Sequence, residues 1–251
     1  MWHSKGHLVN LGSCAKNGGE LIYKIRMTCM SEILTYQCAD SVVTMTLDDG
    51  KANAFGIEMI AALSAGLDRA LKDAKVVVIT GRPGVLCGGF DLKVIRGDDE
   101  VKKDAMRNAG LEAMLKLYAH PQPVIFACTG HSVAAGALLL LTGDHRIGVS
   151  GVYKIGLNEV AIGLPLPVYG LELARDRLDP RALGAATLGA EIYDPDGAVA
   201  AGYLDQAVDA DGLVDAAQDV AARMSELDPG AFAATKLRLR LGTIARIRGA
   251  E

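Results

Sequence analysis

Short apolar runs and segments of helical periodicity alternate along this chain. Residues 42–47 (VVTMTL) and 76–80 (VVVIT) are rich in β-branched residues, a composition typical of strands. Between them, apolar residues recur at helical spacing from residue 57 to residue 71. The order strand, helix, strand predicts a parallel sheet covered by helices, so we expect an α/β fold.

The middle of the chain predicts a buried strand followed by a buried helix. Residues 123–128 (PVIFAC) form an unbroken apolar run that suits a strand buried on both faces, and Gly130 ends it. Residues 134–141 (AAGALLLL) are apolar on every side, so a helix here must lie inside the protein. Helices are also predicted over residues 105–118, 171–177, 180–188 and 232–248, with Pro180 in the first turn of its helix. Residues 97–104 (GDDEVKKD) predict a polar loop or helix start that forms a mobile, solvated rim.

The start of the predicted buried helix is a candidate anion site. The first N–H groups of a helix have no intrahelical partner and lie at the positive end of the helix dipole. Small residues at this point, Gly130, Ala134, Ala135 and Gly136, let a ligand oxygen approach the backbone. The same residues are also typical of close packing between a helix and a strand, so both interpretations stay open.

Glu159 is a candidate general base. It lies in the sequence IGLNEVAIGLP, whose apolar residues indicate at least partial burial. A desolvated carboxylate has a raised pKa and is a better base. The alternative is a loop glutamate whose neighbours alone are buried.

Composition and charge narrow the class of protein. At 251 residues, of which 50% are hydrophobic and 22% charged, the chain can bury one sizeable core. A formal net charge of −4 gives no general reason to expect nucleic-acid binding. The five cysteines lack paired spacing, which favours a reducing compartment, and we expect a cytoplasmic protein. Histidines, cysteines and carboxylates are too scattered for a metal site, and no apolar run approaches the length of a membrane span.

The pattern of the core begins near Met30. Residues 1–29 lack sustained periodicity and an apolar segment of secretory length, so we treat them as an N-terminal appendage. Residues 30–251 are expected to form one domain, with the core at about 30–190 and a helical C-terminal region at 191–251.

Several segments together resemble the crotonase (enoyl-CoA hydratase/isomerase) family. These are the glycine-rich helix start followed by Glu159 in an apolar loop, residues 76–93 (VVVITGRPGVLCGGFDLK), residues 51–54 (KANA) and residues 198–209 (AVAAGYLDQAVD). The resemblance runs from about Met30 to near the C-terminus. It implies a crotonase-like spiral core of repeated ββα units with a C-terminal helical region. It further implies a homotrimer or hexamer that binds an acyl-CoA thioester.

The resemblance also implies roles for individual residues. The backbone N–H groups of Phe90 and Ala135 would form an oxyanion hole, and Glu159 would be the catalytic residue. Coenzyme A would enter as part of the substrate, with no separate cofactor and no metal. The residues that would line the CoA and substrate site are Lys51, Ala52, Gly88, Asp91, Leu92 and Leu138. Lys236 in the last predicted helix would meet the nucleotide phosphates, and the alternative for the basic residues of this helix is a solvated or inter-subunit face. For Asp91 a helix cap is the alternative.

One position departs from the hydratases of this family. They place a glutamate three residues after the oxyanion N–H, and this chain has Leu138 there. Hydration needs a group that activates water, usually with a partner carboxylate, and leucine cannot supply one. A double-bond shift needs one base that takes a proton from C2 and returns it at C4 while two N–H groups hold the enolate oxygen. The chain is therefore expected to resemble the single-glutamate Δ3,Δ2-enoyl-CoA isomerases.

Other functions stay open at this point. Glu112 is the nearest candidate for a second acid in a hydratase, although it also fits a solvated helix face. A homologue that binds acyl-CoA without turnover would also fit the loss of one glutamate. Residues 130–134 (GHSVA) resemble the nucleophile elbow of a serine hydrolase, with Ser132 as nucleophile, but only His145 could serve as its histidine. Residues 81–89 match neither a dinucleotide nor a P-loop motif.

Overall fold

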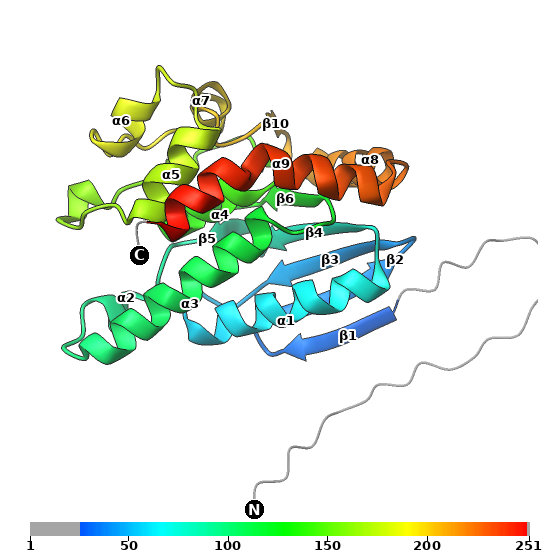
Figure 1. Cartoon of the computed structure of the whole chain (residues 1–251), viewed down its shortest axis with the longest axis horizontal. Helices are drawn as coiled ribbons and strands as arrows, with labels where there is room; N and C mark the ends of the chain where they lie inside the picture. Colours follow the sequence, from blue (N-terminus) through cyan, green and yellow to red (C-terminus); the bar gives the residue numbers. More distant parts are fainter. Residues whose placement is uncertain (1–25, 250–251) are drawn as a thin grey trace, which may run out of the picture.

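The fold is built on one large sheet. The computed structural model describes residues 26–249, and Figure 1 shows the sheet with its strands in the order β1-β2-β3-β4-β6-β8-β10. The first three are antiparallel neighbours, and from β3 onward adjacent strands are parallel. Their bounds are Arg26–Ser31 (β1), Leu34–Ala39 (β2), Val42–Leu47 (β3), Val76–Gly81 (β4), Val124–Cys128 (β6), His145–Val149 (β8) and Gln206–Val208 (β10).

A second, smaller sheet contains β5 (Gly84–Cys87), β7 (Gly130–Val133) and β9 (Ile155–Gly156), all parallel. Each of these strands follows a strand of the large sheet, in the pairs β4 and β5, β6 and β7, and β8 and β9. A helix follows each pair, so the chain repeats a ββα unit. This confirms the predicted α/β crotonase-like architecture.

The helices largely follow the predicted pattern. Their bounds are Ile57–Asp73 (α1), Leu92–Ile95 (α2), Glu100–Tyr118 (α3), Ala135–Thr142 (α4), Val168–Arg177 (α5), Leu183–Thr187 (α6), Pro195–Ala201 (α7), Leu213–Ser225 (α8) and Pro229–Arg248 (α9). Residues 100–104 form the start of α3, one of the two predicted possibilities, because Asp99 accepts a hydrogen bond from the Lys102 N–H and so caps the helix. One predicted detail is wrong: Pro180 precedes α6, which begins at Leu183.

The central strands β4 and β6 of the large sheet are buried on both faces. Val77 and Ile79 of β4 face a core that α1, α3, α4 and α5 share, whereas Val76 and Val78 face a smaller core made with α8. Figure 1 shows α1, α3 and α9 side by side across the sheet, and α8 contacts β4, β6 and β8. The unbroken apolar sequences of β4 and β6 follow from this double burial.

The N-terminal boundary and the C-terminal region of the domain were both predicted from the sequence. β1 begins at Arg26 and pairs with β2, so part of the segment assigned to the appendage belongs to the sheet. Residues 1–25 lie outside the described residues, and the boundary at residue 30 stays a prediction. The C-terminal region is helical except for β10, which joins the large sheet beside β8. No helix within residues 26–249 is both long and apolar enough to cross a bilayer.

Candidate active site

The small sheet brings the predicted catalytic groups to one edge. Its three strands are parallel and lie in the order β5-β7-β9, so their carboxyl ends point the same way. Phe90 follows β5, Ala135 follows β7 and Glu159 follows β9. Groups from distant parts of the sequence therefore lie at neighbouring strand ends, which is where α/β folds commonly place their ligands.

Glycine allows the segment before Phe90 to approach the start of α4. Gly89 has φ +101°, and a Cβ on it would lie 3.7 Å from the backbone nitrogen of Ala135. The segment is also held from the other side, because the Gly88 N–H donates to the Ala52 carbonyl at 2.8 Å and the Phe55 N–H donates to the Gly89 carbonyl at 2.8 Å. The two predicted oxyanion donors thus belong to segments in direct contact.

Among the described residues, the backbone N–H groups of Phe90 and Ala135 have no hydrogen-bond acceptor. The first intrahelical bond of α4 runs from the Leu138 N–H to the Ala134 carbonyl at 3.0 Å, so the Ala135 N–H precedes it and has no intrahelical partner. The Phe90 N–H donates to no protein acceptor among the described residues. Ala134 has φ +53°, a strained value for a residue with a side chain, and it turns the chain from β7 into α4.

Glu159 is buried and its carboxylate is incompletely satisfied. Its exposed fraction is 8%, and Oε2 is buried without a hydrogen-bond partner within the described part of the chain. Its backbone is fixed, because the Glu159 carbonyl accepts from the N–H groups of Ile162 at 3.0 Å and Leu164 at 2.9 Å. Burial raises the pKa of the Glu159 carboxyl, as expected for a base in an apolar loop.

Two buried phenols near Glu159 were not predicted. Tyr169 in the first turn of α5 and Tyr203 after α7 are 7% and 0% exposed. Burial raises the pKa of both phenols, and the Glu159 carboxylate raises them further, so both stay protonated at neutral pH. No local pattern marks a tyrosine in a helix or loop as a neighbour of a residue elsewhere, so the sequence offered no signal for them.

Leu138 lies on α4, the helix that begins with the predicted donor Ala135, and its side chain faces α5. Its side chain is 1% exposed, and its Cδ1 lies 3.3 Å from the position that a Cβ on Gly170 would take. Gly170 directly follows Tyr169 on α5. The leucine therefore packs into the contact between α4 and α5, on the same helix as Ala135.

The residues predicted to hold CoA lie on or near the surface beside this site. Lys51, Ala52 and Gly88 are exposed, and Leu92 is half-exposed. Asn53 between them is fully buried, and its Nδ2 donates to the Leu47 carbonyl at 2.8 Å, which anchors the turn. Asp91 caps α2 by accepting from the Lys93 N–H at 2.9 Å, so the alternative role foreseen for it is confirmed. Binding of CoA by these residues stays a prediction.

Lys236 was expected to contact the nucleotide phosphates, but its side chain is buried in the protein. The side chain is 4% exposed, and its Nζ lies 2.5 Å from Oδ2 of Asp144. An ammonium group buried against a carboxylate is not available to a nucleotide phosphate. The predicted solvated face of this helix is also wrong here, because α9 buries Lys236, Arg240 and Thr243 along with Ile247.

Glu112 lies on the outer surface of α3. Its carboxylate forms an ion pair with Arg248 of α9, and this hydrogen bond lowers its pKa. It borders a cavity of about 660 Å³ between α1, α3 and α9 whose lining does not include Glu159. An ionised, surface carboxylate is a poor proton donor, so the solvated-face interpretation is the correct one.

The serine hydrolase alternative is wrong on geometry. Ser132 lies inside β7, pairs with Ile155 of β9 and is fully buried, whereas an elbow nucleophile stands at an exposed turn. His145 lies on β8 of the large sheet, with its Nδ1 3.8 Å from Oδ2 of Asp205. Nor do residues 26–249 contain a group of three or more His, Cys, Asp or Glu side chains that could hold a metal ion.

Comparison with known proteins places these features in a family context. Residues 37–244 match the family model described as enoyl-CoA hydratase/isomerase. A structure of an enoyl-CoA hydratase/isomerase family protein from Pseudomonas syringae is 43% identical with a TM-score of 0.86, covering 88% of this chain and 96% of the other. Two structures of one Mycobacterium tuberculosis protein, named a probable enoyl-CoA hydratase in one and an enoyl-CoA isomerase in the other, are 39% identical. Their TM-scores are 0.84 and 0.83, and they cover 87% of this chain and 92% and 95% of the other. Human mitochondrial enoyl-CoA delta isomerase 1 is 27% identical over 210 residues, which are 82% of this chain and 70% of the human protein.

Proposed function

Because the chain belongs to the enoyl-CoA hydratase/isomerase family, we propose that this enzyme shifts the double bond of a 3-enoyl-CoA to the 2 position. The observation that carries the proposal is the position of Phe90, Ala135 and Glu159, each of which follows the carboxyl end of one of the three neighbouring small-sheet strands. One base and two hydrogen-bond donors are the groups that an enolate mechanism requires.

Glu159 is the proposed base and acid. Its carboxylate takes a proton from C2 of the substrate, and the resulting carboxylic acid returns that proton at C4. The raised pKa brings the two protonation states closer in free energy and so supports both steps. The unpartnered Oε2 supports the same role, because a free lone pair is needed to accept the proton.

The N–H groups of Phe90 and Ala135 are the proposed oxyanion hole. Proton loss from C2 moves negative charge onto the thioester oxygen, and donors that are already in place stabilise this charge without reorganisation. Ala135 adds the positive end of the α4 dipole.

Leu138 supports isomerisation over hydration. A second carboxylate that assists hydration would lie on α4 at this position, which holds a buried leucine instead. Tyr169 and Tyr203 have raised pKa values and cannot act as bases at neutral pH. These observations favour isomerisation over hydration.

Substrate binding is proposed for the exposed segments beside the oxyanion hole. Lys51, Ala52, Gly88, Asp91 and Leu92 lie on the two segments that are hydrogen-bonded to each other through Gly88 and Ala52. Coenzyme A would bind there as part of the substrate, and the reaction as written consumes no further cofactor.

A paired assay tests the proposal. Wild-type enzyme and Glu159→Gln are each given a 3-enoyl-CoA and a 2-enoyl-CoA, and isomer formation and hydration are followed separately. We expect isomerisation without hydration in the wild type, and a loss of about 10²- to 10⁴-fold in the variant.

Glu112→Gln is the matched control, because it makes the same chemical change on the outer surface of α3. It should retain isomerase activity. Hydration by the wild type that disappears in Glu112→Gln would contradict the proposal and assign a hydratase. Isomerisation that survives Glu159→Gln would remove Glu159 from the mechanism.

A further inference from the structure

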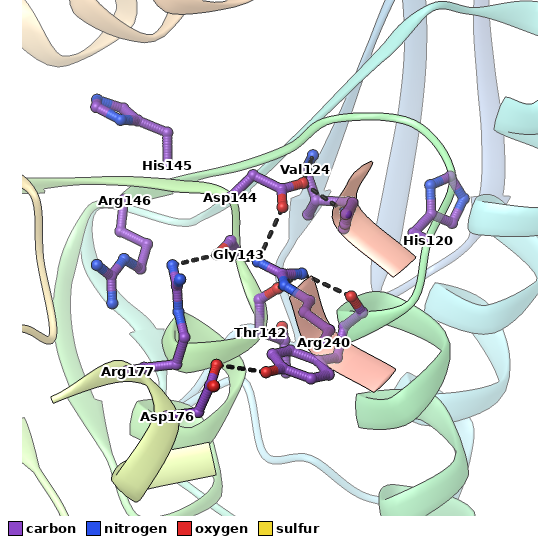
Figure 2. Close-up of polar contacts among 12 residues, drawn as sticks. His120, Val124, Thr142, Gly143, Asp144, His145, Arg146, Asp176, Arg177 and Arg240 are labelled. Atoms are coloured by element: carbon purple, nitrogen blue, oxygen red, sulfur yellow. Dashed lines mark hydrogen bonds and ion pairs between the residues drawn. The ribbon is translucent and has the colours of Figure 1, made fainter. Parts of the chain in front are cut away.

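A buried polar cluster surrounds the C-terminal end of α4, away from the end that carries the Ala135 N–H. Figure 2 shows this cluster, in which cationic side chains from α5 and α9 reach the last carbonyls of α4 and the residue Asp144. The cationic members are Arg177, Lys236 and Arg240. Cations are the charges that the negative end of a helix dipole favours.

Arg240 is the centre of this cluster. Its guanidinium is 2% exposed and donates to the Tyr118 carbonyl at 2.6 Å, the Thr142 carbonyl at 3.2 Å and the Gly143 carbonyl at 3.2 Å. It also lies 2.9 Å from Oδ1 of Asp144. One side chain of α9 therefore joins the C-terminal ends of α3 and α4.

Asp144 links the same point to the large sheet. Its Oδ2 accepts from the Val124 N–H of β6 at 2.8 Å and from Lys236 at 2.5 Å. The rigid guanidinium of Arg240, stacked on the Tyr118 ring at 4.4 Å, can satisfy several acceptors at once. Strand β6 and helices α3, α4 and α9 thus converge where α4 ends (Figure 2).

Both ends of α4 are held in place. All eight of its residues (AGALLLLT) are buried, and its only polar side chain, Thr142, bonds to the Leu139 carbonyl of the same helix. At the N-terminal end the Ala134 N–H donates to the Gly156 carbonyl at 3.0 Å, and Gly136 lies against the backbone of Cys87. At the C-terminal end the carbonyls of Thr142 and Gly143 accept from Arg240 of α9, and such directed hydrogen bonds resist sliding and rotation of the helix.

We infer that Arg240 is a positioning residue for the oxyanion hole, which acts through α4 and does not touch the substrate. By holding the Thr142 and Gly143 carbonyls, it helps to fix the axial position of the helix and with it the Ala135 N–H at the other end. The inference rests on the proposed function, so its test includes a binding measurement that needs no turnover.

The test compares a CoA thioester with the matching CoA thioether, which lacks the carbonyl oxygen. The ratio of their dissociation constants reports how strongly the N–H groups hold the oxygen. In Arg240→Met we expect this preference for the thioester to fall by about 10-fold, with thioether binding unchanged. The kcat/KM for isomerisation should fall by at least a similar factor, with KM rising together with the dissociation constant of the thioester.

Arg240→Lys keeps the charge but not the planar fork, and it should lie between the wild type and Arg240→Met. Arg238→Met is the control, because it removes an exposed arginine from the same helix. Thermal unfolding identifies which variants are folded, and Arg240→Lys carries the test if Arg240→Met does not fold.

The outcomes are separable. A folded Arg240 variant with lower thermal stability but an unchanged thioester preference and kcat/KM would overturn the inference and leave Arg240 a purely structural residue. If the wild type isomerises no enoyl-CoA, the proposed function fails. Loss of the thioester preference in Arg240→Met would support the positioning role even then.

Discussion

Gly136 in the first turn of α4 lies directly against the backbone of Cys87, the last residue of β5, and a Cβ on Gly136 would overlap the Cys87 carbonyl oxygen. The contact sets the distance between the segment that carries Phe90 and the helix that begins at Ala135. The absence of a side chain at this position is therefore part of the geometry of the proposed oxyanion hole.

Gly136→Ala is expected to push these two segments apart. The displacement of a donor should lower kcat by about 10²-fold, and the overpacking should lower the free energy of unfolding by about 1–3 kcal/mol. Steady-state kinetics and denaturant unfolding measure the two effects. Gly184→Ala in α6 is the control, because its Cβ would meet nothing within 4 Å. Wild-type kcat in Gly136→Ala would show that the contact does not set the donor geometry.

The pH dependence of isomerisation should follow the ionisation of Glu159. Because burial raises the pKa of this carboxyl, the base form is lost on acidification at a higher pH than for an ordinary glutamate. We expect kcat/KM to rise with pH through this pKa and then to level off, since Tyr169 and Tyr203 stay protonated. A pH–rate profile with its acid limb at or below the ordinary glutamate pKa would contradict this assignment.

Glu159→Gln should stabilise the fold at neutral pH. The folded-state pKa of Glu159 lies above its unfolded value, so its contribution to stability is complete below the unfolded pKa and is lost as pH rises through the folded pKa. Removal of the buried charge should then raise the free energy of unfolding by on the order of 1 kcal/mol at neutral pH and by much less in acid. Urea unfolding of both proteins at pH 4.0 and pH 7.5, taken as roughly the two limits, measures the difference. An equal gain at both values would point to packing instead of charge.

Lys236→Met should destabilise the protein without weakening CoA binding. It leaves Asp144 with Arg240 as its remaining cation, and the loss of one buried partner should cost about 3–5 kcal/mol. Calorimetric titration with CoA on the folded variant checks the binding. A large loss of CoA affinity would restore the role in phosphate binding that its burial argues against.

Exposed leucines on α9 predict self-association. Leu237 and Leu241 lie one turn apart and are 49% and 56% exposed, and such neighbouring apolar side chains are typical of an interface. Light scattering after size-exclusion chromatography should give the mass of three or six chains, and Leu241→Glu should lower it. Val101→Glu on α3, another exposed apolar position, is the control. A monomeric wild type would contradict the prediction.

The centre of the large sheet could be predicted because β4 and β6 are buried on both faces and have continuous apolar sequences. β3, with its alternating burial, has the predicted bounds, whereas β6 differs from prediction by one residue at its start and α4 by one residue at each end.

The small sheet could not be predicted in this way. β7 (GHSV) and β9 (IG) are short and lack the apolar runs of β4 and β6, and their strand conformation depends on pairing, of β7 with β5 and β9 and of β9 with β7.

The proposed catalytic groups were predicted from the resemblance and from apolar neighbours, whereas the residues that support them were not predicted. Glu159 was marked by its apolar neighbours, which do bury it. The inward charges of α9 were expected on a solvated face, because helical periodicity normally places lysine and arginine outside. Lys236 and Arg240 are buried because their acceptors are Asp144 and the carbonyls at the ends of α3 and α4, which lie about a hundred residues earlier in the chain. No local pattern reveals such partners.

The place of α9 in the chain also orders the events of biosynthesis. Translation releases Phe90, Ala135 and Glu159 before residues 229–248, and domains begin to fold as they are made. Until α9 has emerged, the carbonyls at the end of α4 and the Asp144 carboxylate lack the arginine and lysine that satisfy them. The nascent chain thus contains the proposed site residues before it contains α9. On the inference above, their final arrangement waits for the helix that carries Arg240.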